Sequence, residues 1–471
     1  MSSIIPPGWV KARPYQQQAI ERWLEADGSG ILRMATGTGK TITALLAATQ
    51  ISDIVNNNLL IVIGAPYQHL VDQWASELRE FDVDPILAYQ SRREWQPRLE
   101  REILELNNGI KNICVVVTTH KTLSSDNMRK TLHRLRGHGM IIADEVHHLG
   151  ADHTQNALMD LFDLRLALSA TPERWYDDEG TAVLREYFGD TVFNYGLDEA
   201  IKSNFLCEYY YIPHITELED DEMNVYLGLS AKIGQIIASS KGKDSTELDE
   251  NQSLQTLLFK RARLIGTARK KADTVVNLLN REDDPQFSLV YCGGGNTNTD
   301  GNDERHVDEV TTRINNECGL TVNRFTAREK QEEREQLLQQ FESGETEVLT
   351  SIRCLDEGVD VPATKTAYLL ASTSNPRQYI QRRGRILRKH ESKRFAVIHD
   401  FITVPDVSGY PELLSNKEFE AERSMIRKEI KRVSMFAESA RNHPDADVKN
   451  IPTTPGKLRE LRRQYDLLSE Q

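Results

Sequence analysis

The chain has 471 residues, of which 39% are hydrophobic and 27% charged, and this composition suits a globular protein with two or three domains. No apolar run approaches the ~20 residues of a membrane span, and the first residues lack the plan of a secretion signal, so we expect a cytoplasmic protein without a membrane partner. The net charge of −13 does not exclude a nucleic-acid partner, because residues 377–394 carry eight Lys/Arg against one Glu.

The first part of the chain, residues 1–205, alternates short apolar runs with helical patterns at 41–54 and 68–81. The runs are continuously apolar, as expected for strands buried on both faces of a parallel sheet. They predict one parallel α/β domain. Its predicted strands are residues 30–34, 59–64, 113–118, 140–143 and 166–169.

Residues 265–405 repeat this plan, so we predict an α/β protein with two tandem parallel-sheet domains. A helical and irregular insertion, residues 206–264, connects them; it contains a strand candidate at 208–213 and a polar, mobile loop at 239–253. Residues 406–471 form a helical extension, with helices expected at 416–442 and 455–469. The predicted strands of the second domain are residues 287–292, 321–325, 347–349, 366–370 and 395–399.

Residues 35–41 read Ala-Thr-Gly-Thr-Gly-Lys-Thr and lie between a predicted strand and a predicted helix. Glycines let backbone N–H groups close around phosphate oxygens, and the helix N-terminus adds partial positive charge. We expect Lys40 to reach the β- and γ-phosphates of a nucleoside triphosphate and Thr41 to bind Mg²⁺. A plain glycine turn is the alternative, because Met34 stands where the strict pattern has glycine. The predicted nucleotide-binding residues here are Thr36, Gly37, Thr38, Gly39, Lys40 and Thr41.

Asp144 and Glu145 follow the apolar run 140–143 and should emerge at the carboxyl edge of the sheet, where such folds bind ligands. Asp144 would hold Mg²⁺, directly or through water, and Glu145 would accept a proton from the attacking water. The alternative is a metal cluster built on three nearby histidines, His147, His148 and His153. The five cysteines are scattered without a CxxC pair, which argues against a disulfide framework and structural zinc.

Residues 381–388 read Gln-Arg-Arg-Gly-Arg-Ile-Leu-Arg. Arg385 and Arg388 have the i, i+3 spacing that places them on one helix face, and Gly384 allows close approach. Arginines supplied in trans can neutralise charge that develops on the γ-phosphate, and losing one costs on the order of 10³–10⁵ in rate. A solvated basic helix face is the alternative.

Together these segments resemble the superfamily 2 helicases, in the DExH-type branch, over roughly residues 10–400. The resemblance implies two RecA-like lobes with ATP and Mg²⁺ at their interface, and ATP hydrolysis stimulated by nucleic acid. Residues 145–148, 172–174 and 357–362 look most similar to the repair helicases related to xeroderma pigmentosum group B and to the helicase subunits of type I and III restriction systems, which are DNA translocases. The repair helicases have Arg-Glu-Asp where this chain has Arg-Trp-Tyr at 174–176, so strand separation by that element is not implied.

The resemblance also assigns residues motif by motif. Arg13 and Gln16 match the adenine-recognition segment, and Gly358 and Asp360 of motif V are implied near the nucleotide. The implied catalytic set is Lys40, Asp144, Glu145, Gln381, Arg385 and Arg388, with the last three acting at the γ-phosphate. The implied nucleic-acid contacts are Pro66, Thr118, Thr119, Ser169, Thr171 and Thr350.

We therefore expect an ATP-dependent DNA helicase or translocase that acts in DNA repair, restriction or phage defence, with protein partners of such a complex. One alternative is an ATP-gated DNA-binding scaffold subunit whose partner docks on the tail after residue 405. Another is an RNA helicase of the same superfamily. Glu429 and Lys431 spell the ExK of some nucleases, but no convincing aspartate on an upstream strand accompanies them, so they predict a solvated helix.

Overall fold

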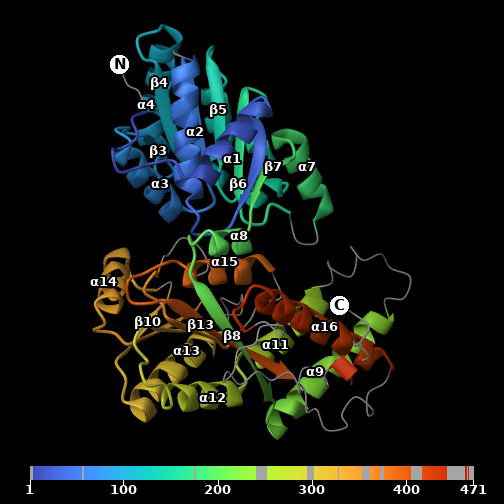
Figure 1. Ribbon diagram of the computed structural model, residues 1–471. Helices are drawn as coiled ribbons and strands as arrows, with labels where there is room; N and C mark the ends of the chain where they lie inside the picture. The colour runs from blue at the N-terminus through green and yellow to red at the C-terminus, as the bar shows by residue number, and fades with distance from the viewer. Residues whose placement is uncertain are drawn as a thin grey trace. The chain divides into compact units, whose positions relative to one another are not determined.

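The computed structural model describes residues 4–55, 58–173, 177–239, 252–293, 302–326, 328–352, 361–371, 376–404, 416–442, 462–463 and 465. The chain divides into two compact units, Met1–Phe205 and Leu206–Gln471, each with its own parallel sheet (Figure 1). Most of the predicted loop at 239–253, most of the predicted helix at 455–469, the Arg-Trp-Tyr segment and the motif V residues Gly358 and Asp360 lie outside the described residues.

The first unit is a parallel sheet flanked by helices, with the strand order β3-β4-β2-β5-β6-β1-β7 (Figure 1). Its strands are β1 (Ser29–Met34), β2 (Leu59–Ala65), β3 (Ile86–Ala88), β4 (Ile113–Thr119), β5 (His138–Ala143), β6 (Leu164–Ser169) and β7 (Thr191–Tyr195). Its helices are α1 (Pro14–Glu25), α2 (Lys40–Val55), α3 (Gln68–Glu80), α4 (Arg92–Asn107), α5 (His120–Leu123), α6 (Asp126–Leu132), α7 (Asp178–Phe188) and α8 (Leu197–Lys202), with 3₁₀ turns η1 (Val146–Gly150) and η2 (Gln155–Ala157).

All five strands predicted for this unit are confirmed, and two more complete the sheet. Every residue of β2 and β4 is buried, which explains why these runs are continuously apolar. The prediction missed β3 and β7. The first has only three residues, and the second is an edge strand with two exposed positions, so neither produces a long apolar run.

The second unit has the strand order β10-β11-β9-β12-β13-β8. Its strands are β8 (Glu208–Glu217), β9 (Ser288–Tyr291), β10 (Val322–Phe325), β11 (Val348–Ser351), β12 (Thr366–Leu369) and β13 (Phe395–Val404). Its helices are α9 (Asp220–Ser239), α11 (Gln252–Gly266), α12 (Arg269–Leu279), α13 (Asn302–Arg313), α14 (Gln331–Glu342), α15 (Pro376–Ile386) and α16 (Asn416–Glu438), with a π-helical turn η3 (Ile314–Cys318).

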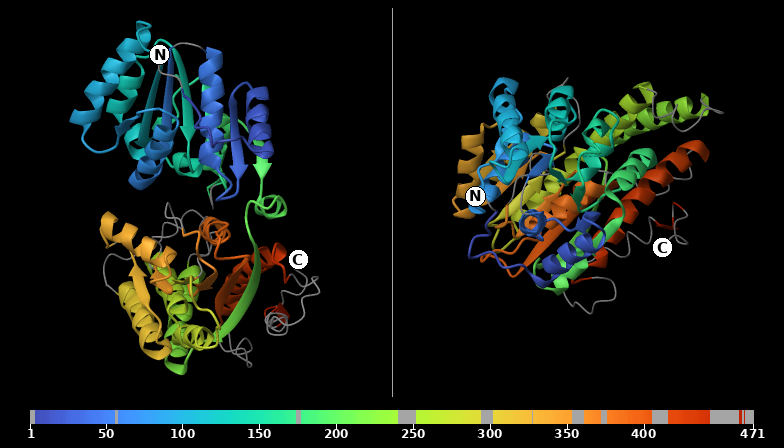
Figure 2. Two further views of the ribbon diagram at one scale, coloured as in Figure 1. Left: turned by 60° about the vertical axis from the view of Figure 1, so that its left-hand side comes forward. Right: turned by 90° about the horizontal axis from the view of Figure 1, so that it is seen from above.

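Strand β8 corrects the predicted organisation, which placed it in the connecting insertion. It pairs in parallel with β13 along its whole length, from Glu208 opposite Phe395 to Glu217 opposite Val404, and forms the edge of the second sheet. Figure 2 shows β8 in green beside β13. The two strands are far apart in sequence, so no local pattern reveals that they pair.

Part of the C-terminal extension covers the edge that β8 would otherwise expose. The Asn442 amide accepts from the Tyr211 N–H at 2.9 Å and donates to the Tyr211 carbonyl at 2.8 Å, as a neighbouring strand would. The Tyr209 hydroxyl donates to the Phe436 carbonyl of α16 at 2.5 Å. Such cover protects an edge strand from pairing with other chains.

Helix α16 also carries a buried ion pair. Arg432 lies 3.1 Å from the Asp400 carboxylate of β13, and their side chains are 4% and 0% exposed. Arg432 also pairs with Glu429 at 2.8 Å. Of the two residues predicted to be solvated, Lys431 is exposed, whereas Glu429 is half-buried because it pairs with Arg432. None of the described helices combines the length and apolarity needed to cross a membrane.

Candidate active site

The turn between β1 and α2 has the backbone conformation needed to surround an anion. Gly37 and Gly39 have φ angles of 86° and 79°, in the left-handed region that favours glycine. The Thr38 hydroxyl donates to the Ala35 carbonyl at 2.7 Å and closes the turn. Helix α2 starts at Lys40, so its N-terminal N–H groups follow directly, as in phosphate-binding loops.

Two neighbouring side chains of helix α1 donate hydrogen bonds to the backbone of this turn. The Tyr15 hydroxyl donates to the Thr38 carbonyl at 2.6 Å, and the Gln16 amide donates to the Gly39 carbonyl at 3.3 Å. A Cβ atom on Gly39 would lie 3.0 Å from that amide nitrogen. Tyr15 also stacks on Tyr195 with ring centroids 4.1 Å apart. Tyr15 was not among the predicted site residues, although it lies between two residues assigned to adenine recognition.

Arg13 and Gln16, the predicted adenine contacts, are linked to each other. The Arg13 N–H donates to the Gln16 side-chain oxygen at 3.0 Å, and the Arg13 guanidinium lies 4.4 Å from the centroid of the Phe205 ring. Gln16 is buried and Arg13 is exposed at the helix start. The pair therefore connects the exposed start of α1 to the glycine turn.

The predicted carboxylates lie directly after β5, beside the glycine turn. Lys40 Nζ is 3.6 Å from Glu145 Oε1. Asp144 is buried at the carboxyl end of β5. Its Oδ2 accepts a hydrogen bond from Trp74 Nε1 and its Oδ1 accepts one from the Glu145 N–H, both at 3.0 Å. Glu145 has a φ of 43°, a left-handed conformation that is uncommon outside glycine and occurs where function requires it. The structure thus brings Lys40, Asp144 and Glu145 together.

The environment of Asp144 suits a cation. Burial, and next the neighbouring Glu145 charge, raise the pKa of Asp144 to about 6, while Lys40 and the two hydrogen bonds act in the opposite direction. A positive ion beside the carboxylate would offset both effects that raise the pKa. The Asp144 carboxylate and the half-buried Thr41 hydroxyl are the oxygen ligands that Mg²⁺ prefers. Thr36 Oγ1 is buried and finds no hydrogen-bond partner among the described residues.

The histidines after Glu145 do not form a metal centre. No group of three or more His, Cys, Asp or Glu residues in the described ranges is arranged to hold a metal ion. His147 Nδ1 instead lies 3.6 Å from Glu145 Oε2 and 3.5 Å from the Ser169 hydroxyl. Ser169 Oγ in turn accepts from the Thr171 N–H at 3.1 Å. These contacts connect the proposed catalytic carboxylate to the Ser-Ala-Thr segment, residues 169–171.

Most of the predicted nucleic-acid contacts have buried side chains. Thr118 donates to the Ala88 carbonyl of β3 at 2.6 Å, and the Thr350 hydroxyl bonds the Thr311 hydroxyl of α13 at 2.6 Å, so both hydroxyls already have a partner within their own unit. Thr119 caps α5, and Ser169 and Thr171 are buried as well. Pro66, just beyond β2, is half-buried. At the buried positions, contacts to a nucleic-acid strand would have to come from backbone atoms.

Helix α15 of the second unit carries the predicted arginine segment. Gln381 and Arg385 are buried, and Arg383 donates to the Tyr209 hydroxyl at 3.2 Å and to the Met435 carbonyl at 2.9 Å. The helix ends at Ile386, so Arg388 is not on its face as predicted; it forms a β-bridge with Leu206. The physical reason is that the backbone beyond α15 pairs with another segment, as the Cys207 N–H donates to the Leu387 carbonyl at 2.8 Å.

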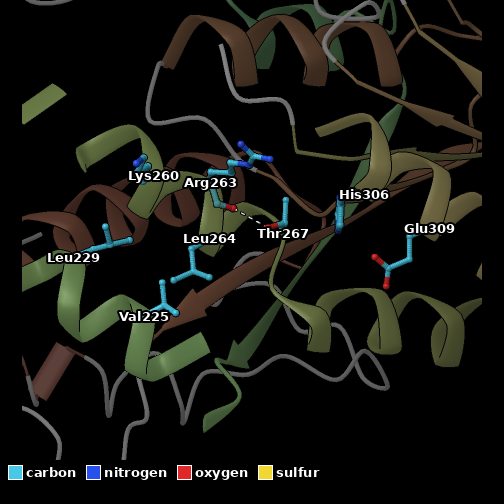
Figure 3. Close-up of a pocket in the computed structure, with 8 residues that line it drawn as sticks. All are labelled: Val225, Leu229, Lys260, Arg263, Leu264, Thr267, His306 and Glu309. Carbon is cyan, nitrogen blue, oxygen red and sulfur yellow. Dashed lines mark hydrogen bonds between the residues drawn. The ribbon is translucent and has the colours of Figure 1, made fainter. Parts of the chain in front are cut away.

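A cavity of about 460 Å³ lies elsewhere in the second unit (Figure 3). None of the predicted site residues that the structure describes lines it. Burial lowers the pKa of His306, one of its lining residues, to about 4, so its ring is neutral at pH 7. The lining residues are Val225, Leu229, Lys260, Arg263, Leu264, Thr267, His306 and Glu309.

Two family models match the chain. The model described as type III restriction enzyme, res subunit, matches residues 10–174, and the helicase conserved C-terminal domain matches residues 270–390. The first range contains the glycine turn, the two carboxylates and the Ser-Ala-Thr segment. The second contains the arginine segment.

Individual proteins that are similar to this chain include a DNA translocase and a restriction-enzyme subunit. The DNA 3'-5' translocase XPB2 of Sulfurisphaera tokodaii is 26% identical over 404 residues, which cover 82% of this chain and 81% of that protein. The type I restriction enzyme EcoAI endonuclease subunit of Escherichia coli is 26% identical over 292 residues, or 59% of this chain and 32% of that protein. The chain thus spans most of the first relative and about a third of the second.

A solved structure confirms the predicted fold of tandem RecA-like domains. The ATP-dependent Type ISP restriction-modification enzyme LlaBIII bound to DNA has a TM-score of 0.61 and 16% sequence identity, and the match covers 97% of this chain and 32% of that chain. At this identity the likeness concerns the fold alone.

Proposed function

We propose a function for this chain from one premise: it belongs to the superfamily 2 helicases. We infer that it is a DNA translocase or helicase, which hydrolyses ATP in response to DNA and acts in DNA repair, restriction or phage defence. One observation carries the proposal. Lys40, on the glycine turn, lies 3.6 Å from Glu145, beside the buried Asp144, so phosphate binding and water activation can occur at one edge of one sheet.

In this proposal, each candidate site residue of the first unit has a defined task. The N–H groups of the glycine turn and Lys40 bind the β- and γ-phosphates. Thr41 and Asp144 hold Mg²⁺, which supplies positive charge at the phosphate oxygens. Glu145 accepts the proton of the attacking water, and its position is maintained by Lys40 and His147. Arg13 and Gln16 contact the base.

The second unit supplies the remaining groups. We propose that Gln381, Arg385 and Arg388 act on the γ-phosphate, and that Gly358 and Asp360 lie near the nucleotide. The nucleic-acid strand would follow the carboxyl edges of the sheets, where Pro66 and the segments around Thr118, Ser169 and Thr350 lie. The relative from Sulfurisphaera tokodaii supports DNA as the partner, because its name describes a DNA translocase.

The test is the ATPase rate of the purified protein with Mg²⁺ and with single-stranded DNA, duplex DNA, forked DNA or RNA in turn. We expect DNA to stimulate hydrolysis and RNA to have little effect. DNA affinity should fall with salt, with a slope of roughly 0.7–0.9 per neutralised phosphate on a double logarithmic plot. Stimulation by RNA alone would replace the proposal with an RNA helicase.

A triplex-displacement assay separates movement from gated binding. A translocase removes the third strand from duplex DNA in an ATP-dependent reaction without a partner protein. A scaffold subunit would bind DNA, hydrolyse ATP slowly and leave the triplex intact. The scaffold alternative assigned the tail to partner docking, whereas α16 packs on β8 and β13 of its own unit.

A further inference from the structure

Trp74 makes an unusual hydrogen bond for a core tryptophan. It projects from the buried face of α3 and is 1% exposed, with Val71, Ala75 and Leu78 on the same face. Its indole N–H donates to Asp144 Oδ2 at 3.0 Å. A core side chain on one helix thus contacts the carboxylate that we propose as a Mg²⁺ ligand.

Burial alone does not require this acceptor. A buried indole N–H needs a hydrogen-bond partner, and a backbone carbonyl suffices. Trp23 in the same unit shows this arrangement: it is 0% exposed, and its Nε1 donates to the Arg165 carbonyl at 3.1 Å. Trp74 has the same burial but uses a charged side chain at the site.

The geometry points to a specific task. Each carboxylate oxygen has two lone pairs. The Trp74 indole occupies one on Oδ2, and the Glu145 N–H occupies one on Oδ1 at 3.0 Å. Two donors on the two oxygens fix the plane of the carboxylate and leave one lone pair on each for a cation or its bound water.

We infer that Trp74 is a positioning residue: it orients the Asp144 carboxylate for Mg²⁺ and so sets how strongly Mg²⁺ strengthens nucleotide binding. The inference rests on the proposed function. Groups that hydrogen-bond to metal ligands are part of the metal site, and their loss costs about 10–100-fold in metal affinity. The sequence does not reveal this role, because nothing in a helical pattern distinguishes Trp74 from a core residue.

The experiment compares Trp74→Phe with the matched control Trp23→Phe. Both remove a buried indole and its hydrogen bond from the same unit, but only the first changes a partner of Asp144. The affinity for a fluorescent ADP is measured with excess Mg²⁺ and again with EDTA, and the ratio gives the gain from Mg²⁺. We expect the wild-type ratio in Trp23→Phe and a ratio lower by about tenfold or more in Trp74→Phe.

The ADP affinity in EDTA distinguishes positioning from damage to the fold. It should stay unchanged in Trp74→Phe. An equal loss in EDTA and in Mg²⁺, or an unchanged ratio, would overturn the inference. If wild-type protein shows no gain from Mg²⁺, the proposed function fails and this inference with it; a normal ratio in both wild type and Trp74→Phe refutes the inference alone.

A spectroscopic measurement on protein that keeps Trp74 covers the case in which Trp74→Phe does not fold. The indole N–H signals are recorded by ¹⁵N NMR, and single Trp→Phe variants at positions 9, 23, 95 and 175 assign the Trp74 signal by elimination. Adding Mg²⁺ and ADP should shift the Trp74 signal and leave the Trp23 signal in place. A Trp74 signal that responds to neither Mg²⁺ nor Asp144→Asn contradicts the inference.

Discussion

Replacement of Arg432 by methionine tests how the C-terminal extension is attached to the second unit. Arg432 Nε and Nη2 donate to the Asp400 oxygens at 3.1 and 3.3 Å, and the two side chains are 4% and 0% exposed. Methionine keeps much of the aliphatic volume, so the main effect is that the Asp400 and Glu429 carboxylates lose the cation that they share. Breaking a buried ion pair in this way costs about 3–5 kcal/mol.

Urea denaturation followed by circular dichroism measures this loss, as a shift of the transition of the second unit. Lys431→Met is the matched control, because Lys431 is the exposed neighbour on the same helix and its replacement should change stability by about 0.5 kcal/mol or less. The double variant Arg432→Met with Asp400→Asn removes the cation and the fully buried carboxylate but leaves Glu429 without Arg432, so it should recover part of the loss.

Two results would refute this reasoning. One is a loss below about 1 kcal/mol in Arg432→Met, which would mean that water or another group compensates the Asp400 charge. The other is a double variant whose loss equals the sum of the two single losses. In that case the two residues are not coupled, and α16 is held by apolar packing and by contacts such as the bond between Tyr209 and Phe436.

Three further predictions concern the first unit. Lys40→Ala and Glu145→Gln should each abolish DNA-stimulated phosphate release and leave the circular dichroism spectrum unchanged; near-normal turnover of Glu145→Gln would disprove the general-base assignment. Gly39→Ala should weaken ATP binding by about tenfold or more, because the left-handed φ of 79° strains a side chain and the new Cβ would meet Gln16 at 3.0 Å; calorimetric titration checks this. The pKa of Asp144 is raised from 3.8 to about 6, so the folded unit binds this proton more tightly than the unfolded chain does, and the resulting stability is present below pH ~4 and lost as the pH rises through ~6. In EDTA, the free energy of unfolding of Asp144→Asn should therefore rise relative to that of wild type by up to about 3 kcal/mol between pH 4.5 and 7.5. A stability difference between the two proteins that does not vary with pH would show that burial does not raise this pKa.

The buried strands and the order of the chemical motifs could be predicted because they are local. Residues of β2 and β4 are apolar at every position since both faces of the sheet are covered, and this pattern is visible without any coordinates. The glycine turn is equally local, because left-handed φ angles at Gly37 and Gly39 are an intrinsic preference of glycine. Asp144 and Glu145 could be placed at the sheet edge for the same reason, since they directly follow a strand.

Contacts between distant segments were decided by tertiary structure alone. Tyr15 reaches the glycine turn and Trp74 reaches Asp144 only after α1 and α3 have packed against the sheet. Likewise, β8 joins the second sheet because β13 offers it a partner far along the chain. A sequence specifies the conformational preference of each residue and the faces that must leave water, but which side chains then share a hydrogen bond depends on how those faces pack.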